Sequence, residues 1–284
     1  MLPVETLKNY PKLFKASEHP IHLLYVIMIP ILILLGTIYD YYLYKNSNPL
    51  VLFIIKPLPV CLMITCGFVY MCMYKIHCYA QQMTISLWMC LIGDVFLMFY
   101  SPPEFEEFGM LILGGVAFFV ARVCMSVTFL LYPYSFSHPC LSLPLSVKGN
   151  RYRLLIALIL SVGYLAAAIT FVILKHLDIG MSIFLFIYLL SMSLQLCCAC
   201  LRVGGFEIEI KGSQVFGLIG TILFTISDSL LLYDMFIDSI SMSNIISINL
   251  YWLGLYFLTI SMVRSDSYRI EKSGSENFPL VDDF

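Results

Sequence analysis

The stretch Trp88-Met-Cys-Leu-Ile-Gly-Asp-Val-Phe-Leu-Met-Phe99 holds one carboxylate, Asp94, among apolar side chains. The stretch Phe224-Thr-Ile-Ser-Asp-Ser-Leu-Leu-Leu-Tyr233 holds Asp228 in a similar setting. A carboxylate in hydrocarbon is costly, and it usually serves a function that faces the protein interior or a water-filled cavity. Asp94 and Asp228 are therefore our candidate catalytic residues.

The composition tells which solvent surrounds these carboxylates. Hydrophobic residues make up 60% of the 284 residues, charged residues only 12%, and the mean hydropathy is +0.90. These values lie far outside the range of soluble domains and indicate an integral membrane protein. The net charge of -2, with basic residues scattered among loops, argues against nucleic-acid binding.

A window of about 20 residues, the length that crosses the hydrocarbon of a bilayer, predicts eight transmembrane helices. The chain lacks the short alternating strands of a membrane barrel. The predicted fold is thus all-α, a polytopic membrane helical bundle over residues 22–263. A cytosolic segment, residues 1–21, precedes it and a disordered cytosolic tail, residues 264–284, follows it. The predicted spans are residues 22–39, 50–74, 84–100, 109–132, 154–174, 180–201, 214–233 and 243–263.

The basic residues predict the orientation of this bundle. Twelve of the sixteen Lys and Arg residues fall on the side that holds both termini, whereas Lys45 and Lys175 fall on the other side. Lys56 and Arg122 lie within spans. The excess of positive charge predicts cytosolic termini. The chain has no Asn-x-Ser/Thr sequence and no paired cysteine spacing in the non-cytosolic loops, which fits residence in the endoplasmic reticulum.

The two aspartates occupy related positions in this scheme. Gly93-Asp94 and Ser227-Asp228 are each followed by apolar residues, at equivalent places in two parallel groups of four spans, which suggests a 4+4 internal repeat. At 1.5 Å per residue, Asp94, Asp228 and Lys56 lie about 8–9 Å from the non-cytosolic end, and Arg122 lies about 20 Å from it. We expect one polar layer with Arg122 at its floor.

A structural ion-pair network is the competing interpretation, because buried charges must be paired whatever their role. Two carboxylates would balance one Lys and one Arg. The sequence predicts neither a metal site nor a cofactor, since no second ligand stands at helical spacing from a histidine and no phosphate-binding glycine loop occurs. Any reaction would therefore rely on acid–base catalysis by carboxylates.

Three short motifs give the chain a family resemblance. Lys56-Pro57-Leu58 at the second span, Gly93-Asp94 in the third and Ser227-Asp228 in the seventh resemble the YhhN-like (TMEM86) family, which includes the lysoplasmalogenases. The chain length and the predicted layout agree with this family.

The resemblance implies hydrolysis of the vinyl ether bond of lysoplasmalogens, which releases a fatty aldehyde and glycerophospho-ethanolamine or glycerophosphocholine. Acid cleavage of a vinyl ether places a proton on carbon and gives an oxocarbenium ion that water traps. Asp94 and Asp228 would serve as acid and carboxylate, in an order that the sequence leaves open. Lys56 and Arg122 are the candidate substrate-binding residues: Lys56 would hold one aspartate ionised or contact the head-group phosphate, and Arg122 would bind the phosphate with its planar fork. The expected partners are a lysophospholipid and membrane lipids.

One departure from the family pattern concerns the fourth span. Relatives tend to carry His-Leu-Leu-Tyr where this chain reads Arg122-Val-Cys-Met125. This exchange of a titratable donor for a permanent cation leaves two alternatives to the enzyme: a lipid-binding protein without catalysis, and a small-solute transporter on the same bundle.

Overall fold

The computed structural model describes residues 20–45, 49–74, 78–99, 108–131, 151–174, 179–203, 211–236 and 242–276. All regular structure in these ranges is helical, which confirms the all-α prediction. Of the predicted terminal segments, residues 1–19 and 277–284 lie outside the described residues, whereas residues 264–276 of the predicted tail belong to the last helix, which ends at Glu276. The helices are α2 (Pro20–Lys45), α3 (Pro49–Ile55), α4 (Leu58–Tyr74), α5 (Cys78–Met98), α6 (Phe108–Leu131), α7 (Arg151–Leu174), α8 (Ile179–Arg202), α9 (Lys211–Phe236) and α10 (Ser243–Glu276).

The prediction of eight transmembrane helices is wrong in number. Within the described residues, six helical stretches are long and apolar enough to cross a membrane, and they lie in α3–α4, α5, α6, α8, α9 and α10. The other two predicted spans correspond to α2 and α7, whose described apolar stretches, Met28–Tyr42 and Ala157–Ala166, are shorter than a bilayer requires. The predicted internal repeat finds no support and stays a prediction.

The chain divides into two compact units, residues 1–52 and 53–284. The first unit contains α2, a helix with Pro30 in its interior. The second unit contains α4 to α10, and the candidate site residues all belong to it.

A proline breaks the predicted second span into two helices. Helix α3 ends at Ile55 and α4 begins at Leu58, with Lys56 and Pro57 forming the turn between them. Proline lacks a backbone N–H and disfavours helical geometry in the residue before it. The Pro57 carbonyl accepts a 3.0 Å hydrogen bond from the Cys61 amide, which starts α4. Lys56 thus sits at an interruption of the helix.

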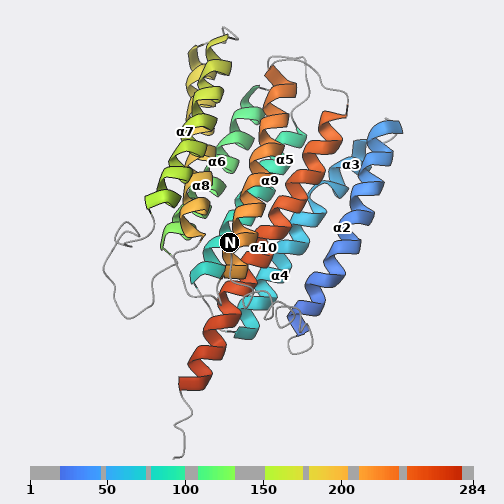
Figure 1. The fold of residues 1–284 in the computed structure, drawn as a ribbon. Helices are drawn as coiled ribbons and strands as arrows, with labels where there is room; N and C mark the ends of the chain where they lie inside the picture. The colour runs from blue at the N-terminus through green and yellow to red at the C-terminus, as the bar shows by residue number, and fades with distance from the viewer. Residues whose placement is uncertain are drawn as a thin grey trace, which may run out of the picture. The chain divides into compact units, whose positions relative to one another are not determined.

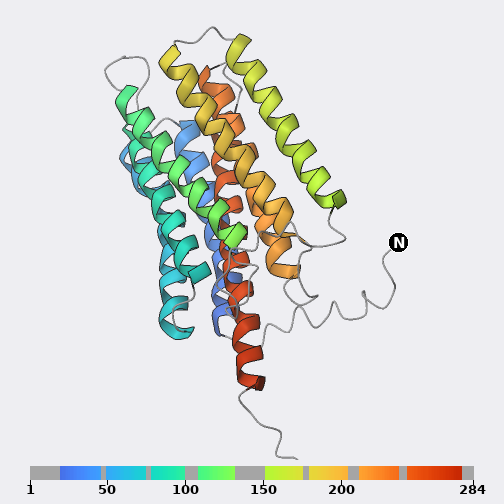
Figure 2. The same cartoon turned by 90° about the vertical axis from the view of Figure 1, so that its left-hand side faces the viewer.

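Helix α10 packs most extensively against α9 and also contacts α4 and α5 (Figure 1). Helix α8 contacts α6, α7 and α9, whereas α7 packs mainly on α8 at one edge. Figure 2 shows this edge position of α7, and it also shows α10 continuing past the ends of its neighbours.

Small residues allow the closest helix contacts. A Cβ atom on Gly220 of α9 would stand 2.7 Å from the carbonyl oxygen of Gly254 in α10. On α6, a Cβ on Gly114 would meet Leu97 at 3.0 Å, and one on Gly115 would meet Phe184 at 2.3 Å. Glycine at these positions lets neighbouring backbones and side chains approach as they do in membrane helix pairs.

Side-chain contacts at two heights along the bundle show the direction of each helix. At one depth Tyr79 of α5 and Ser213 of α9 share contacts with Ser261 of α10. Asp94 follows Tyr79 by 15 residues, and Asp228 follows Ser213 by 15 residues, so α5 and α9 run parallel and in the same register. The two depths are therefore about 22 Å apart. This arrangement brings both aspartates to one end of the bundle, as the sequence predicted.

Helices α6 and α8 run in the direction opposite to α5 and α9. Arg122 and Tyr188 lie with Asp228, whereas Phe129 and Arg202, farther along α6 and α8, lie with Tyr79. Because α6 and α8 are parallel, the intervening α7 must carry the chain back across the bundle.

The close approach of α9 and α10 makes a stability prediction. Replacing Gly220 by alanine forces a methyl group against the Gly254 backbone, and we expect a loss of about 1–3 kcal/mol. Thermal unfolding in detergent measures this loss. The matched control is Gly163→Ala on α7, where an added Cβ meets nothing within 4 Å. Equal melting temperatures for the two variants would contradict the packing role of Gly220.

Candidate functional site

Asp228 is held by a buried ion pair with Arg122. Nη2 of Arg122 donates to Oδ2 of Asp228 at 2.6 Å, and the hydroxyl of Tyr188 donates to the same oxygen. Nη1 of Arg122 donates to Oε1 of Gln195 at 2.6 Å. The network joins α6, α8 and α9, and it meets the requirement that a buried charge be both paired and hydrogen-bonded.

Aromatic rings enclose the Arg122 guanidinium. Its central carbon lies 4.1 Å from the centroid of the Phe224 ring and 5.8 Å from that of Tyr188. The side chain is fully buried, and its Nε has no hydrogen-bond partner. Cation–π contact of this kind is strongest where water is excluded, so the rings offset part of the desolvation of the charge.

The environment of Asp94 differs from that of Asp228. Its Oδ2 accepts a 2.8 Å hydrogen bond from the hydroxyl of Tyr251 in α10. No described cation lies within 4.0 Å of its carboxylate. Asp94 is nevertheless as buried as Asp228, at 2% and 6% exposure respectively. One aspartate is therefore paired with a cation and the other with a neutral phenol.

Three aromatic rings connect the surroundings of the two aspartates, because Tyr251 binds Asp94 and Phe224 lies against the Arg122 guanidinium. The ring centroids of Phe118, Phe224 and Tyr251 are 5.5–6.3 Å apart, in edge-on or tilted contact. Gly93 makes room for this group, because a Cβ there would lie 2.7 Å from the Phe118 ring. We call Asp94, Arg122, Tyr188, Asp228 and Tyr251 the aspartate cluster.

Two further residues lie near the aspartate cluster. Cys90, one turn before Asp94, is fully buried within electrostatic range of Asp94, Arg122 and Asp228. The Lys56 ammonium interacts with Asp94 through space but forms no ion pair with it within 4.0 Å. Lys56 is half-buried at the helix break, so it can reach Asp94 or the membrane surface.

The structure thus brings together Asp94, Asp228 and Arg122, with Lys56 at the margin. Arg122 contacts Asp228 directly, whereas the sequence predicted that it lies deeper in the bundle, at the floor of the polar layer. Sequence reasoning did not single out Tyr188, Gln195 and Tyr251. Tyr188 and Tyr251 are hard to recognise from the sequence, because tyrosine is common in this chain and only the fold shows which tyrosines point inward. Gln195 stands out more, since an amide within a span also needs a partner.

A second buried arginine lies at the opposite depth. Arg202 donates to the Tyr79 hydroxyl at 2.5 Å, to Ser261 Oγ at 3.0 Å and to Ser213 Oγ at 2.9 Å. Its guanidinium also lies 4.6 Å from the centroid of the Tyr79 ring. These hydroxyls join α5, α8, α9 and α10. Among the described residues, Arg202 forms no ion pair with a carboxylate, which distinguishes this cluster from that of Arg122.

The Arg122–Asp228 pair makes a double-mutant prediction. Asp228→Leu alone leaves a buried cation without its partner, and Arg122→Met alone leaves a buried carboxylate, so each is expected to lose about 3–5 kcal/mol of stability. The double variant Arg122→Met/Asp228→Leu should recover most of this loss, because both charges are gone. Thermal unfolding in detergent of the four proteins gives the coupling free energy.

The control for this cycle is Asp94→Asn, which removes a carboxylate that has no cation within 4.0 Å. We expect a smaller loss of stability than in either single variant of the pair. Additive losses in the double variant would show that Arg122 and Asp228 do not depend on each other.

Comparison with known proteins bears on this geometry. Residues 51–262 match the model of the YhhN family, a range that contains the whole aspartate cluster and Lys56. No curated protein and no solved structure matches the chain. The family match confirms the resemblance seen in the three motifs. Because it covers well over half of the sequence, the chain belongs to the YhhN family.

Proposed function

We propose that this protein is an integral-membrane hydrolase that cleaves the vinyl ether bond of lysoplasmalogens. The observation that carries the proposal is the pair of buried carboxylates in unlike surroundings, Asp228 with Arg122 and Asp94 with Tyr251. General acid catalysis needs a group that can hold a proton beside one that stays charged. Membership of the YhhN family, which includes lysoplasmalogenases, supplies the substrate class.

The proposed reaction begins with transfer of a proton from Asp94 to the vinyl carbon remote from the ether oxygen. We assign the proton donor to Asp94 because its carboxylate has no cation within 4.0 Å among the described residues, whereas Asp228 forms an ion pair with Arg122. The other vinyl carbon becomes an oxocarbenium ion. The negative charge of Asp228 and the faces of Phe118, Phe224 and Tyr251 would stabilise that cation.

Water then adds to the oxocarbenium carbon and loses a proton to a carboxylate, which gives a hemiacetal. Collapse of the hemiacetal breaks its bond to the glycerol oxygen. The products are a fatty aldehyde and a glycerophospho-alcohol, and the proton given up at the start is regained. The reaction consumes one water and needs no cofactor. Lys56, half-buried near Asp94, is our candidate contact for the head-group phosphate.

We place the protein in the endoplasmic reticulum with both termini in the cytosol. The supporting observation is the distribution of Lys and Arg, most of which fall on one side of the bundle in the predicted topology.

The alternative function is lipid binding without turnover. Its support is the network of Arg122, whose two terminal nitrogens bind Gln195 and Asp228 and are therefore not available to a substrate phosphate. A transporter of small solutes has no specific observation in its favour.

The test is aldehyde release from a lysoplasmalogen by the purified protein in detergent. We expect Asp94→Asn to lower the rate at least about 100-fold, the usual contribution of a general acid. Asp228→Asn should also lower it, because the transition state loses its nearest negative charge. Tyr251→Phe removes the hydrogen bond from the Tyr251 hydroxyl to Asp94 and should reduce the rate less.

The matched control is Asp234→Asn, the same change six residues farther along α9, which should leave the rate unchanged. Full activity in both Asp94→Asn and Asp228→Asn would remove these residues from the mechanism. A folded wild-type protein that binds lysoplasmalogen but releases no aldehyde would favour the binding function.

A further inference from the structure

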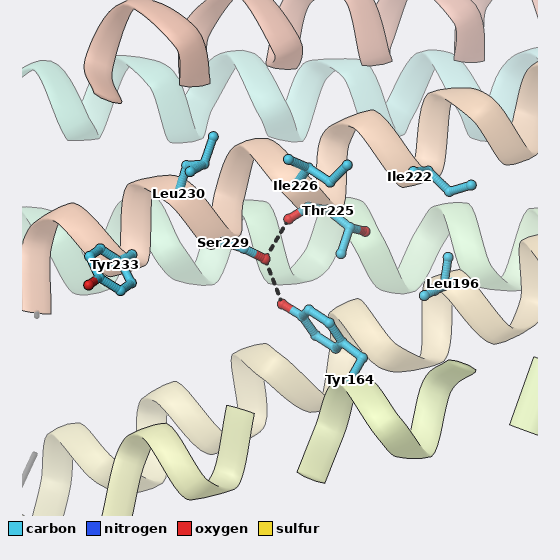
Figure 3. Close-up of a pocket in the computed structure, with 8 residues that line it drawn as sticks. All are labelled: Tyr164, Leu196, Ile222, Thr225, Ile226, Ser229, Leu230 and Tyr233. Atoms are coloured by element: carbon cyan, nitrogen blue, oxygen red, sulfur yellow. Dashed lines mark hydrogen bonds between the residues drawn. The ribbon is translucent and has the colours of Figure 1, made fainter. Parts of the chain in front are cut away.

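An apolar groove runs along the outer side of α9, between this helix, α7 and α8. It has a volume of about 410 Å³, within the range of about 300–1,000 Å³ that small ligands occupy. Its α9 residues form a single stripe from Ile222 to Tyr233, and the 11 residue steps between them correspond to a length of about 16 Å. The lining residues, drawn in Figure 3, are Tyr164, Leu196, Ile222, Thr225, Ile226, Ser229, Leu230 and Tyr233.

The groove has the dimensions of one hydrocarbon chain. The apolar core of a bilayer is about 30 Å thick, so one leaflet contributes about half of that, close to the length of the stripe. The groove lies on α8 and α9, two of the candidate membrane spans. Tyr233, at one end of the stripe, is close to the end of α9, where tyrosine commonly marks the membrane interface. A lipid would therefore lie along the stripe with its polar end toward Tyr233 and its hydrocarbon chain toward Ile222.

Polar groups lie toward the Tyr233 end of the groove. The Tyr164 and Ser229 hydroxyls are 3.0 Å apart, and Ser229 Oγ donates to the Thr225 carbonyl at 2.7 Å (Figure 3). These bonds turn the hydroxyls toward each other and leave an apolar lining. Tyr164 also lies within electrostatic range of Arg122 and Asp228. The polar end of the groove is thus next to the aspartate cluster.

Thr225 differs from the other threonines in the described helices. The other seven donate their hydroxyl to the carbonyl four residues earlier, as Thr221 does to Gly217 at 2.9 Å. The Thr225 hydroxyl oxygen is buried and has no hydrogen-bond partner. Leaving a buried hydroxyl unpaired costs about 1–3 kcal/mol. An oxygen atom brought into the groove by a ligand would supply the missing partner.

We propose that this groove binds the single hydrocarbon chain of a lysophospholipid, with the linkage oxygen of the chain beside Thr225 and Ser229. The inference rests on the proposed function for the identity of the lipid. It goes beyond that function in assigning the chain to one face of α9. The vinyl ether lies where the chain joins the glycerol, so this placement sets the reacting bond close to Asp228.

Photolabelling tests the location directly. The probe is a lysophospholipid with a diazirine in the middle of its chain, added to the full-length protein in nanodiscs, irradiated and mapped by mass spectrometry. We expect cross-links on Leu196, Ile222 and Ile226, reduced about tenfold by an excess of unlabelled lysophospholipid. Cross-links spread evenly over the exposed residues of all spans, or insensitive to competition, would overturn the proposal.

A pair of variants sharpens the test. Ile226→Trp fills the groove and should reduce the cross-links on α8 and α9 about tenfold. Ile85→Trp makes the same change at a matched exposure, 43% against 44%, on α5 outside the groove, and should leave them unchanged. Equal labelling in the two variants would contradict the assignment.

Labelling of Asp94→Asn separates this inference from the proposed function, because cross-linking needs no turnover. Groove labelling without aldehyde release by the wild type would uphold the chain site and reject the hydrolase. Aldehyde release with labelling elsewhere would reject the chain site and keep the hydrolase.

Discussion

The buried ion pair of Arg122 and Asp228 constrains the rest of the second unit. A charge within a membrane protein needs a partner in the interior, and an arginine can satisfy several acceptors only if they converge on its planar group. Here α9 supplies Asp228 and α8 supplies Gln195, so α6, α8 and α9 must keep a fixed register. The chain directions follow from this register, including the return through α7.

The ion pair also makes the two aspartates chemically unlike. If both were solvated, or both paired with cations, they would have similar proton affinities and could not divide the work of an acid and a base. Asp94 instead accepts a hydrogen bond from Tyr251, whose ring packs on Phe224, and Phe224 in turn lies against Arg122. The two aspartates therefore differ in their direct partners although aromatic contacts connect their surroundings.

Sequence reasoning predicted the features that depend on local composition. Apolar stretches predicted the positions of the membrane helices, and charged residues within those stretches identified Asp94, Asp228 and Arg122 as candidates. Each of these patterns can be recognised within a single segment of the chain. The number of spans was wrong because α2 and α7 are helical without a long enough described apolar stretch. The depth of Arg122 was misjudged because counting residues gives the height of a Cα atom, not the reach of a long side chain toward Asp228. Tyr188, Gln195 and Tyr251 could not be found, since they become partners only through contacts between distant segments.

Helix α9 contributes residues both to the aspartate cluster and to the apolar groove. Successive residues of an α-helix are rotated by about 100°, so Asp228 and Ser229 face different sides of the same turn. Asp228 points inward to Arg122, whereas Ser229 points to Tyr164 at the groove. A lipid whose chain lies in the groove therefore brings its linkage atoms within about one helical turn of Asp228 along α9.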